Sequence, residues 1–178
     1  VNGSIGCGSC AAGTFTSQVG QPECSPCPLG TSNGVTGQSA CVPCSPGRFA
    51  NVTGLEQCLP CAAGTAQPSN GASACVDCIA GTYIASTGGI NCLLCPAGTA
   101  IGVNGSTVCI DCVAGTMQQI PGSTGCADGT LGYYSNTPTA TTCTVCAAGT
   151  IANPTGPPVC TTSSLGHSPP FTDHRVCP

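Results

Sequence analysis

The sequence predicts a small disulfide-rich fold: short β-hairpin-like units arranged as an elongated, solenoid-like rod of 17-residue Cys-x2-Cys repeats, with no helix of note. Cysteine recurs every 17 residues from Cys7 to Cys177 without an insertion or deletion, and such a fixed register is typical of arrays whose units pack only on their neighbours. The 178 residues include 19 Cys, 26 Gly, 16 Pro and no Trp. Disulfides must therefore replace much of an ordinary core.

Each repeat carries two glycines at fixed positions. The first lies six residues after the first cysteine in every repeat, from Gly13 to Gly166. The second lies seven residues further on and is replaced only at Thr139 and Asp173. The presence of the first glycine in every repeat predicts a backbone conformation there that only glycine tolerates. The polar and β-branched residues between the glycines predict two short extended segments per repeat, and the Gly and Pro content disfavours helix.

The residue two positions after the first glycine alternates in size. It is large in Phe15, Phe49, Tyr83 and Met117 and small in the intervening repeats, until Tyr134 breaks the pattern. The alternation indicates a working unit of two repeats. We favour the interpretation that each large side chain packs over its own disulfide. The alternative is an exposed apolar row that bundles chains or binds a partner.

Two repeats are irregular. We divide the chain into regular repeats over residues 1–125 and a continuation over 126–178, which contains the irregular units 126–142 and 160–176. Gly129 and Ser163 stand there in place of the second cysteine. We expect these units to make contacts that the repeat alone does not predict. The chain starts part-way through a repeat and ends one residue after Cys177, so we expect a processed product or a piece of a longer array.

Sequence alone does not fix which cysteines pair. Bonds within each Cys-x2-Cys would form small strained rings, whereas bonds from the second cysteine of one repeat to the first of the next would each close one glycine-rich loop. The second scheme gives Cys10–Cys24, Cys27–Cys41, Cys44–Cys58, Cys61–Cys75, Cys78–Cys92, Cys95–Cys109, Cys112–Cys126 and Cys146–Cys160. This scheme assigns no partner to Cys7, Cys143 and Cys177, and one of them could form an intermolecular disulfide.

The segments Cys10–Thr14, Cys27–Thr31 and Cys95–Thr99, which read Cys-Ala-Ala-Gly-Thr, Cys-Pro-Leu-Gly-Thr and Cys-Pro-Ala-Gly-Thr, resemble the ephrin-receptor-like cysteine-rich repeat. The first loop also resembles the opening module of tumour necrosis factor receptor domains, which supports the Cys10–Cys24 pairing and its equivalents. The resemblance implies extracellular, elongated, non-catalytic repeats. Such arrays occur in receptors, matrix proteins and protist surface proteins, including those of flagellar hairs.

The composition excludes several functions. Only 4% of residues are charged, Arg48 and Arg175 are the only basic ones, and the net charge is −4, so binding to nucleic acid or to acidic membrane surfaces is disfavoured. No apolar run approaches 18 residues, so no membrane span is predicted. The cysteine content predicts an oxidising, extracellular location: secreted, at the cell surface or at a flagellar surface.

No metal, cofactor or enzymatic activity is predicted. Zinc bound by Cys-x2-Cys pairs is disfavoured because the chain lacks the charged residues usual for zinc arrays, and the scattered acids make at most a thin calcium site at Asp111 and Asp128. A grouping that invites comparison with a hydrolase lacks an oxyanion hole and a pocket, so we expect surface residues there: Ser164, His167, Asp173 and His174.

Three acceptor sequences for N-linked glycans begin at Asn2, Asn51 and Asn104, whereas Asn153 is excluded by Pro154. All three lie before or beside the second glycine, in loops that we expect to be exposed. Glycan would explain how a chain with so few charges stays in solution.

These observations predict a structural component of an extracellular filament, flagellar hair or cell-surface coat. Its partners would be copies of itself or fibre proteins of the same kind, with N-linked glycans attached and O-linked glycans as an option. The alternative is the ligand-binding or stalk region of a receptor or secreted signalling protein, with the irregular repeats as the site.

Overall fold

The computed structural model describes residues 9–18, 23–129, 132–148, 150–152 and 159–162. These residues form short β-strands and contain no helix. The strands are β1 Thr14–Phe15, β2 Ser25–Pro26, β3 Thr31–Ser32, β4 Val42–Pro43, β5 Arg48–Phe49, β6 Leu59–Pro60, β7 Thr65–Ala66, β8 Val76–Asp77, β9 Thr82–Tyr83, β10 Leu93–Leu94, β11 Thr99–Ala100, β12 Ile110–Asp111, β13 Thr116–Met117, β14 Ala127–Asp128, β15 Tyr133–Tyr134, β16 Thr144–Val145, β17 Thr150–Ala152 and β18 Cys160–Thr162.

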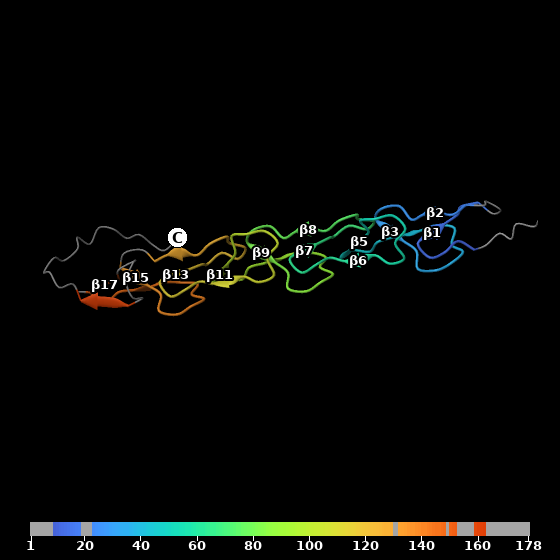
Figure 1. Ribbon diagram of the computed structural model, residues 1–178. Helices are drawn as coiled ribbons and strands as arrows, with labels where there is room; N and C mark the ends of the chain where they lie inside the picture. The colour runs from blue at the N-terminus through green and yellow to red at the C-terminus, as the bar shows by residue number, and fades with distance from the viewer. Residues whose placement is uncertain (1–8, 19–22, 130–131, 149, 153–158, 163–178) are drawn as a thin grey trace, which may run out of the picture. The chain divides into compact units, whose positions relative to one another are not determined.

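Consecutive strands pair as antiparallel two-stranded sheets. The strand after each first glycine pairs with the residues that follow the first cysteine of the next repeat. In β5 and β6, for example, Arg48 lies opposite Pro60 and Phe49 lies opposite Leu59, and Figure 1 shows these two strands side by side. The predicted fold class of disulfide-rich, hairpin-like repeats is confirmed.

A tight turn precedes the first strand of each pair. In the turn Ile79–Thr82, the Thr82 N–H donates to the Ile79 carbonyl at 2.9 Å, and Gly81 has a φ of 83°. A positive φ at the third position of a turn is the signature of type II and requires glycine. The Thr82 hydroxyl also donates to the Ile79 carbonyl, at 2.7 Å. Each first glycine in the described residues has a positive φ, as predicted.

The buried interior consists largely of cysteine. The second cysteines of six repeats are the largest fully buried side chains, and among them Cys27, Cys61 and Cys95 have an exposed fraction of 0%. Around them lie small or aliphatic residues such as Ala50 and Ile84. Burial of such small side chains removes little apolar area from water, at about 25 cal/mol per Å², so disulfides have to supply much of the constraint on the chain.

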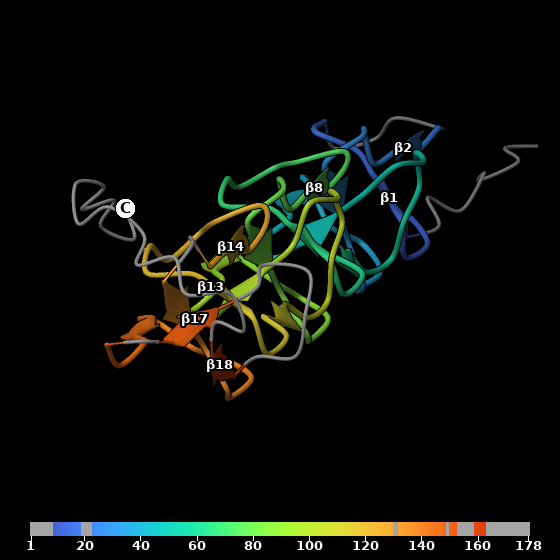
Figure 2. The same ribbon diagram turned by 90° about the vertical axis from the view of Figure 1, so that its left-hand side faces the viewer.

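The chain forms two compact units. The first contains Val1–Cys78 and Ile84–Cys92, and the second contains Ile79–Tyr83 and Leu93–Pro178. The units therefore interleave in sequence: β9 pairs with β10 in the second unit, while the loop that follows β9 belongs to the first. Figure 2 shows β13, β14, β17 and β18 of the second unit. The proposed sequence boundary at residue 125 concerns repeat regularity and stays a prediction.

Candidate functional site

Main-chain hydrogen bonds join each repeat to the next. In the first unit, the Gly47 N–H donates to the Gln67 carbonyl at 2.7 Å, and the Gly71 N–H donates to the Cys44 carbonyl at 2.8 Å. In the second unit, the equivalent bonds run from Gly98 to Gln118 at 2.7 Å and from Gly122 to Cys95 at 2.8 Å. Because only backbone atoms take part, the side chains between the glycines are free to vary.

A second contact reaches two repeats along the chain. A Cβ atom on Gly47 would overlap the carbonyl oxygen of Gly88, which is the second glycine two repeats later. The same overlap would occur between Gly13 and Gly54, Gly30 and Gly71, Gly81 and Gly122, and Gly98 and Thr139. In these five repeats the first glycine is thus required both by its turn and by this close approach, whereas a Cβ on Gly115 or Gly132 would meet no atom within 4 Å. The approach occurs in consecutive repeats, so it does not account for the alternation of large and small residues.

Among the described residues, eight disulfides close the loops, each between cysteines separated by 14 residues, with Cα atoms 5.6 or 5.7 Å apart. That distance is usual for a disulfide. The bonds join Cys10 to Cys24, Cys27 to Cys41, Cys44 to Cys58, Cys61 to Cys75, Cys78 to Cys92, Cys95 to Cys109, Cys112 to Cys126 and Cys146 to Cys160. Cys143 is half-buried, and Cys7 and Cys177 lie outside the described residues.

The eighth repeat keeps two of the main-chain hydrogen bonds of the regular repeats. Thr139 has a φ of 59° and is the one non-glycine residue with positive φ in the described part of the chain. Its N–H donates to the Cys112 carbonyl at 2.9 Å, as a second glycine would, and the Gly129 N–H donates to the Gly115 carbonyl at 3.0 Å. The main chain therefore holds its register without the second cysteine and the second glycine.

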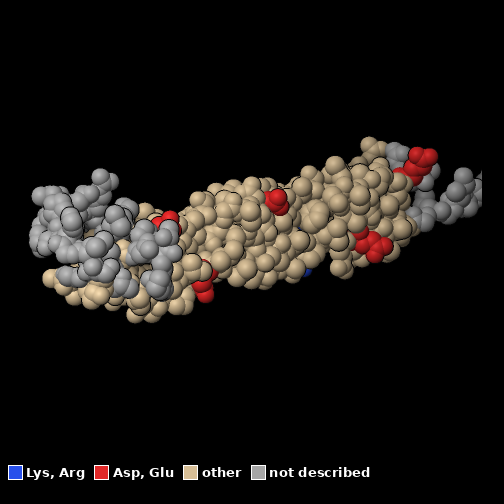
Figure 3. All heavy atoms as spheres, turned by 60° about the vertical axis from the view of Figure 1, so that its left-hand side comes forward, with Lys and Arg blue, Asp and Glu red and all other residues tan. Residues whose placement is uncertain are grey.

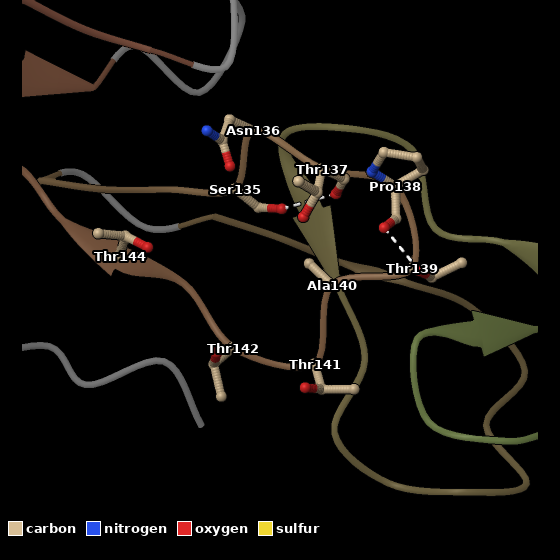
Figure 4. A pocket seen from close by; sticks show the side chains of 9 residues that line it. All are labelled: Ser135, Asn136, Thr137, Pro138, Thr139, Ala140, Thr141, Thr142 and Thr144. Atoms are coloured by element: carbon tan, nitrogen blue, oxygen red, sulfur yellow. Dashed lines mark hydrogen bonds between the residues drawn. The ribbon is translucent and has the colours of Figure 1, made fainter.

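A shallow hollow lies in the same repeat, lined by the nine residues that Figure 4 labels, which run from Ser135 to Thr142 and include Thr144. Most of these residues are threonines, and none is charged. In the tenth repeat, Ser163 and Asp173 lie outside the described residues, and so does the whole grouping Ser164, His167, Asp173 and His174.

The interpretation of the large alternating residues as an exposed apolar row is wrong. Phe15, Phe49 and Tyr83 are half-buried, and Met117 is only 2% exposed. The next residue along the strand is hydrogen-bonded to the following repeat, as in the bond from the Gln118 N–H to the Ala140 carbonyl at 3.1 Å. This bond brings the following repeat close to the strand, which limits the exposure of the large side chain.

Exposed aliphatic residues occupy a different position, the one directly after the first cysteine. The sequence analysis did not predict this exposed set, although the recurrence of an aliphatic residue at one position every 17 residues could have indicated it. Val42 is 67% exposed and lies opposite Ser32, in the strand pair β3 and β4. The others in the set are Leu59 and Val76 in the first unit and Leu93 and Ile110 in the second.

Two of the three acceptor asparagines lie in the described residues. Asn51 and Asn104 are both exposed, and the Asn104 Oδ1 accepts a hydrogen bond from the Ala80 N–H at 2.9 Å. Asn2 lies outside the described residues. An exposed Asn in an acceptor sequence meets the steric requirement for transfer of a glycan.

The surface carries few charges. Figure 3 shows single acidic side chains separated by wide uncharged areas. Arg48 is exposed, and its Nη1 donates to the Cys58 carbonyl at 2.9 Å. Among the described residues, no group of three or more His, Cys, Asp or Glu side chains is arranged to hold a metal ion. The same part of the chain has no helix long and apolar enough to cross a bilayer.

The family model described as tyrosine-protein kinase ephrin type A/B receptor-like matches residues 2–39, 30–78 and 69–112. Together these matches span more than half of the chain. The chain belongs to the ephrin-receptor-like family of cysteine-rich repeats. Ephrin-receptor-like repeats are extracellular, disulfide-stapled and typically non-catalytic modules, so this membership and the disulfides favour an extracellular location. No curated protein matches the chain.

Proposed function

We propose that this chain is part of a structural component of an extracellular filament, flagellar hair or cell-surface coat. One observation carries the proposal. In the described repeats, main-chain hydrogen bonds join one repeat to the next, and in five of them the first glycine also approaches the main chain two repeats along. These interactions need only Gly and Cys at fixed positions, so they can be repeated over any number of units.

The exposed aliphatic residues support association between copies. Val42, Leu59 and Val76 each present an apolar side chain at the same position in successive repeats. Burial of such residues against a second copy would be favourable, at about 25 cal/mol per Å² of apolar area, and few charges oppose the approach. N-linked glycans at Asn51 and Asn104 would keep the remaining surface hydrated.

Electron microscopy of the purified secreted chain, over a range of concentrations, tests the proposal. Ordered filaments are expected for the unmodified protein, and fewer or shorter ones for the variant V42S/L59S/V76S. A matched control, V35S/V52S/I90S, changes three exposed aliphatic side chains outside the strands and should assemble normally. Dispersed particles at every concentration would contradict a filament.

A second candidate function is the ligand-binding or stalk region of a receptor or secreted signalling protein. The open, uncharged hollow of the eighth repeat favours it, because the regular repeats have no such irregular loop. This function predicts dispersed particles that bind one soluble partner. Binding should then weaken when Asn136 and Thr141, which line the hollow, are changed to alanine.

A further inference from the structure

Threonine is concentrated in residues 136–144, which comprise the last loop of the eighth repeat and the first two residues of the ninth, with Thr144 at the start of β16; this segment is called the loop below. Five threonines surround Pro138 within nine residues of sequence, at Thr137, Thr139, Thr141, Thr142 and Thr144. Figure 4 shows their side chains spread around the hollow. Segments rich in Ser and Thr that also contain Pro are the usual carriers of O-linked sugar in extracellular proteins.

The hydroxyls of this loop differ from those of the regular repeats. In the turns, threonine hydroxyls are engaged: Thr99 donates to the Pro96 carbonyl at 2.8 Å, and Thr116 donates to the Val113 carbonyl at 2.8 Å. By contrast, four threonines of the loop are exposed, and their hydroxyls make no hydrogen bond within the described part of the chain: Thr137, Thr141, Thr142 and Thr144. These four oxygens are open to an enzyme that modifies hydroxyl groups.

The loop is also held in place without a disulfide of the regular kind. The Gly115 N–H donates to the Ser135 carbonyl at 2.8 Å, and the Thr139 N–H donates to the Cys112 carbonyl at 2.9 Å. Because Gly129 replaces the second cysteine, the bond that closes every regular loop cannot form here.

We propose that the loop over residues 136–144 is a site of O-linked glycosylation. In the reaction, the Oγ1 atom of a threonine attacks the anomeric carbon of a nucleotide-activated sugar. A carbon–oxygen bond forms as the bond from that carbon to phosphate breaks, the nucleoside diphosphate leaves, and the hydroxyl proton passes to a base of the transferase. No oxidation or reduction occurs. The inference rests on an extracellular location and is independent of the filament proposal.

Peptide mass spectrometry with electron-transfer fragmentation tests the proposal on the chain purified from its natural source, after enzymatic removal of N-linked glycans. Sugar is expected on at least one of Thr137, Thr141, Thr142 and Thr144, and absent from the engaged Thr99 and Thr116. An unmodified loop would overturn the proposal. So would sugar distributed evenly over loop and turn threonines.

A pair of variants expressed in cells of the same source separates the loop from exposed threonines in general. T137A/T141A/T142A/T144A should remove most of the O-linked sugar mass while leaving the disulfide map unchanged. The control T107A/T124A changes two exposed threonines of stapled loops and should leave the sugar mass unchanged. An equal loss of sugar in both variants would overturn the assignment.

Discussion

Gly47 and Gly88 both have positive φ, yet their surroundings differ. A Cβ on Gly47 would overlap a main-chain carbonyl, whereas a Cβ on Gly88 would meet no atom within 4 Å. We predict that G88A costs only the left-handed strain, about 1–2 kcal/mol, and that G47A costs more because a carbonyl oxygen cannot move as a side chain does. The amide exchange rates of Cys61 and Gly88, whose N–H groups bond to this region, measure both costs.

In that exchange experiment, about tenfold faster opening is expected for G88A, since 1.4 kcal/mol corresponds to a factor of ten. Substantially faster opening is expected for G47A. Equal rates in the two variants would show that the two-repeat contact adds nothing to the turn.

Thr139 is the opposite case, because a β-branched residue holds a conformation that suits glycine. Replacement by glycine relieves this strain. It also increases the conformational entropy of the unfolded chain, which costs roughly 0.5–1 kcal/mol of stability. We therefore predict that T139G stabilises the eighth repeat by at most about 1.5 kcal/mol, measured by slower exchange of the residue 139 amide. Faster exchange would show that the threonine side chain itself stabilises the loop.

For individual residues, the sequence predicted much of what the structure shows. The need for glycine at the first position, and the positive φ behind it, could be predicted from its presence in every repeat. The overlap of Gly47 with Gly88 could not, because a spacing of 17 does not say which carbonyl oxygens approach a turn. That Thr139 would keep the hydrogen bond of a glycine was likewise not predictable from a broken pattern.

At the scale of one element, the stapled loop is the unit of stability. Closing a loop of about 15 residues contributes roughly 3 kcal/mol in the chain-entropy model. We predict that C61S/C75S, which removes the bond between Cys61 and Cys75, lowers the free energy of opening of residues 62–74 by about that amount. Amide exchange, resolved along the chain, measures the effect.

The control A62S/A74S introduces the same hydroxyls beside the two cysteines, at exposed positions, and should leave exchange unchanged. The loss in the cysteine variant should be largest in its own loop, because repeats interact mainly with their neighbours. A uniform loss over the whole chain would contradict this one-loop picture.

The hairpin-like elements were predictable from composition and glycine spacing, but their exposed side was not. The sequence left open, as the less favoured alternative, that the large residues such as Phe15 and Phe49 form an outward row. The structure leaves them half-buried and instead exposes Val42 and Leu59 in the second strands of the pairs. In strands of two residues, no alternation is long enough to show which face is covered.

For the whole molecule, the low charge and the repeated backbone hydrogen bonds argue against several classes of function, but they do not point to one particular function. The hydrogen bonds between repeats are made by peptide groups, so they do not indicate which partner the side chains would bind. The candidate sites are instead the exposed departures from the pattern, such as Asn51, Asn104 and the threonines of the eighth repeat. The 17-residue period and the family resemblance predicted the architecture, whereas the solvent exposure of individual side chains was needed to find these candidate sites.

The second cysteine of one repeat bonds the first cysteine of the next, and peptide mapping without reduction tests this pairing most directly. Thiols are blocked during denaturation, and pepsin is the protease because two basic residues leave trypsin little to cut. Cross-linked peptides are expected that join Cys27 to Cys41, Cys61 to Cys75 and the other pairs in the same register. Bonds within Cys24–Cys27 or Cys58–Cys61, or reactive thiols at most cysteines, would contradict it.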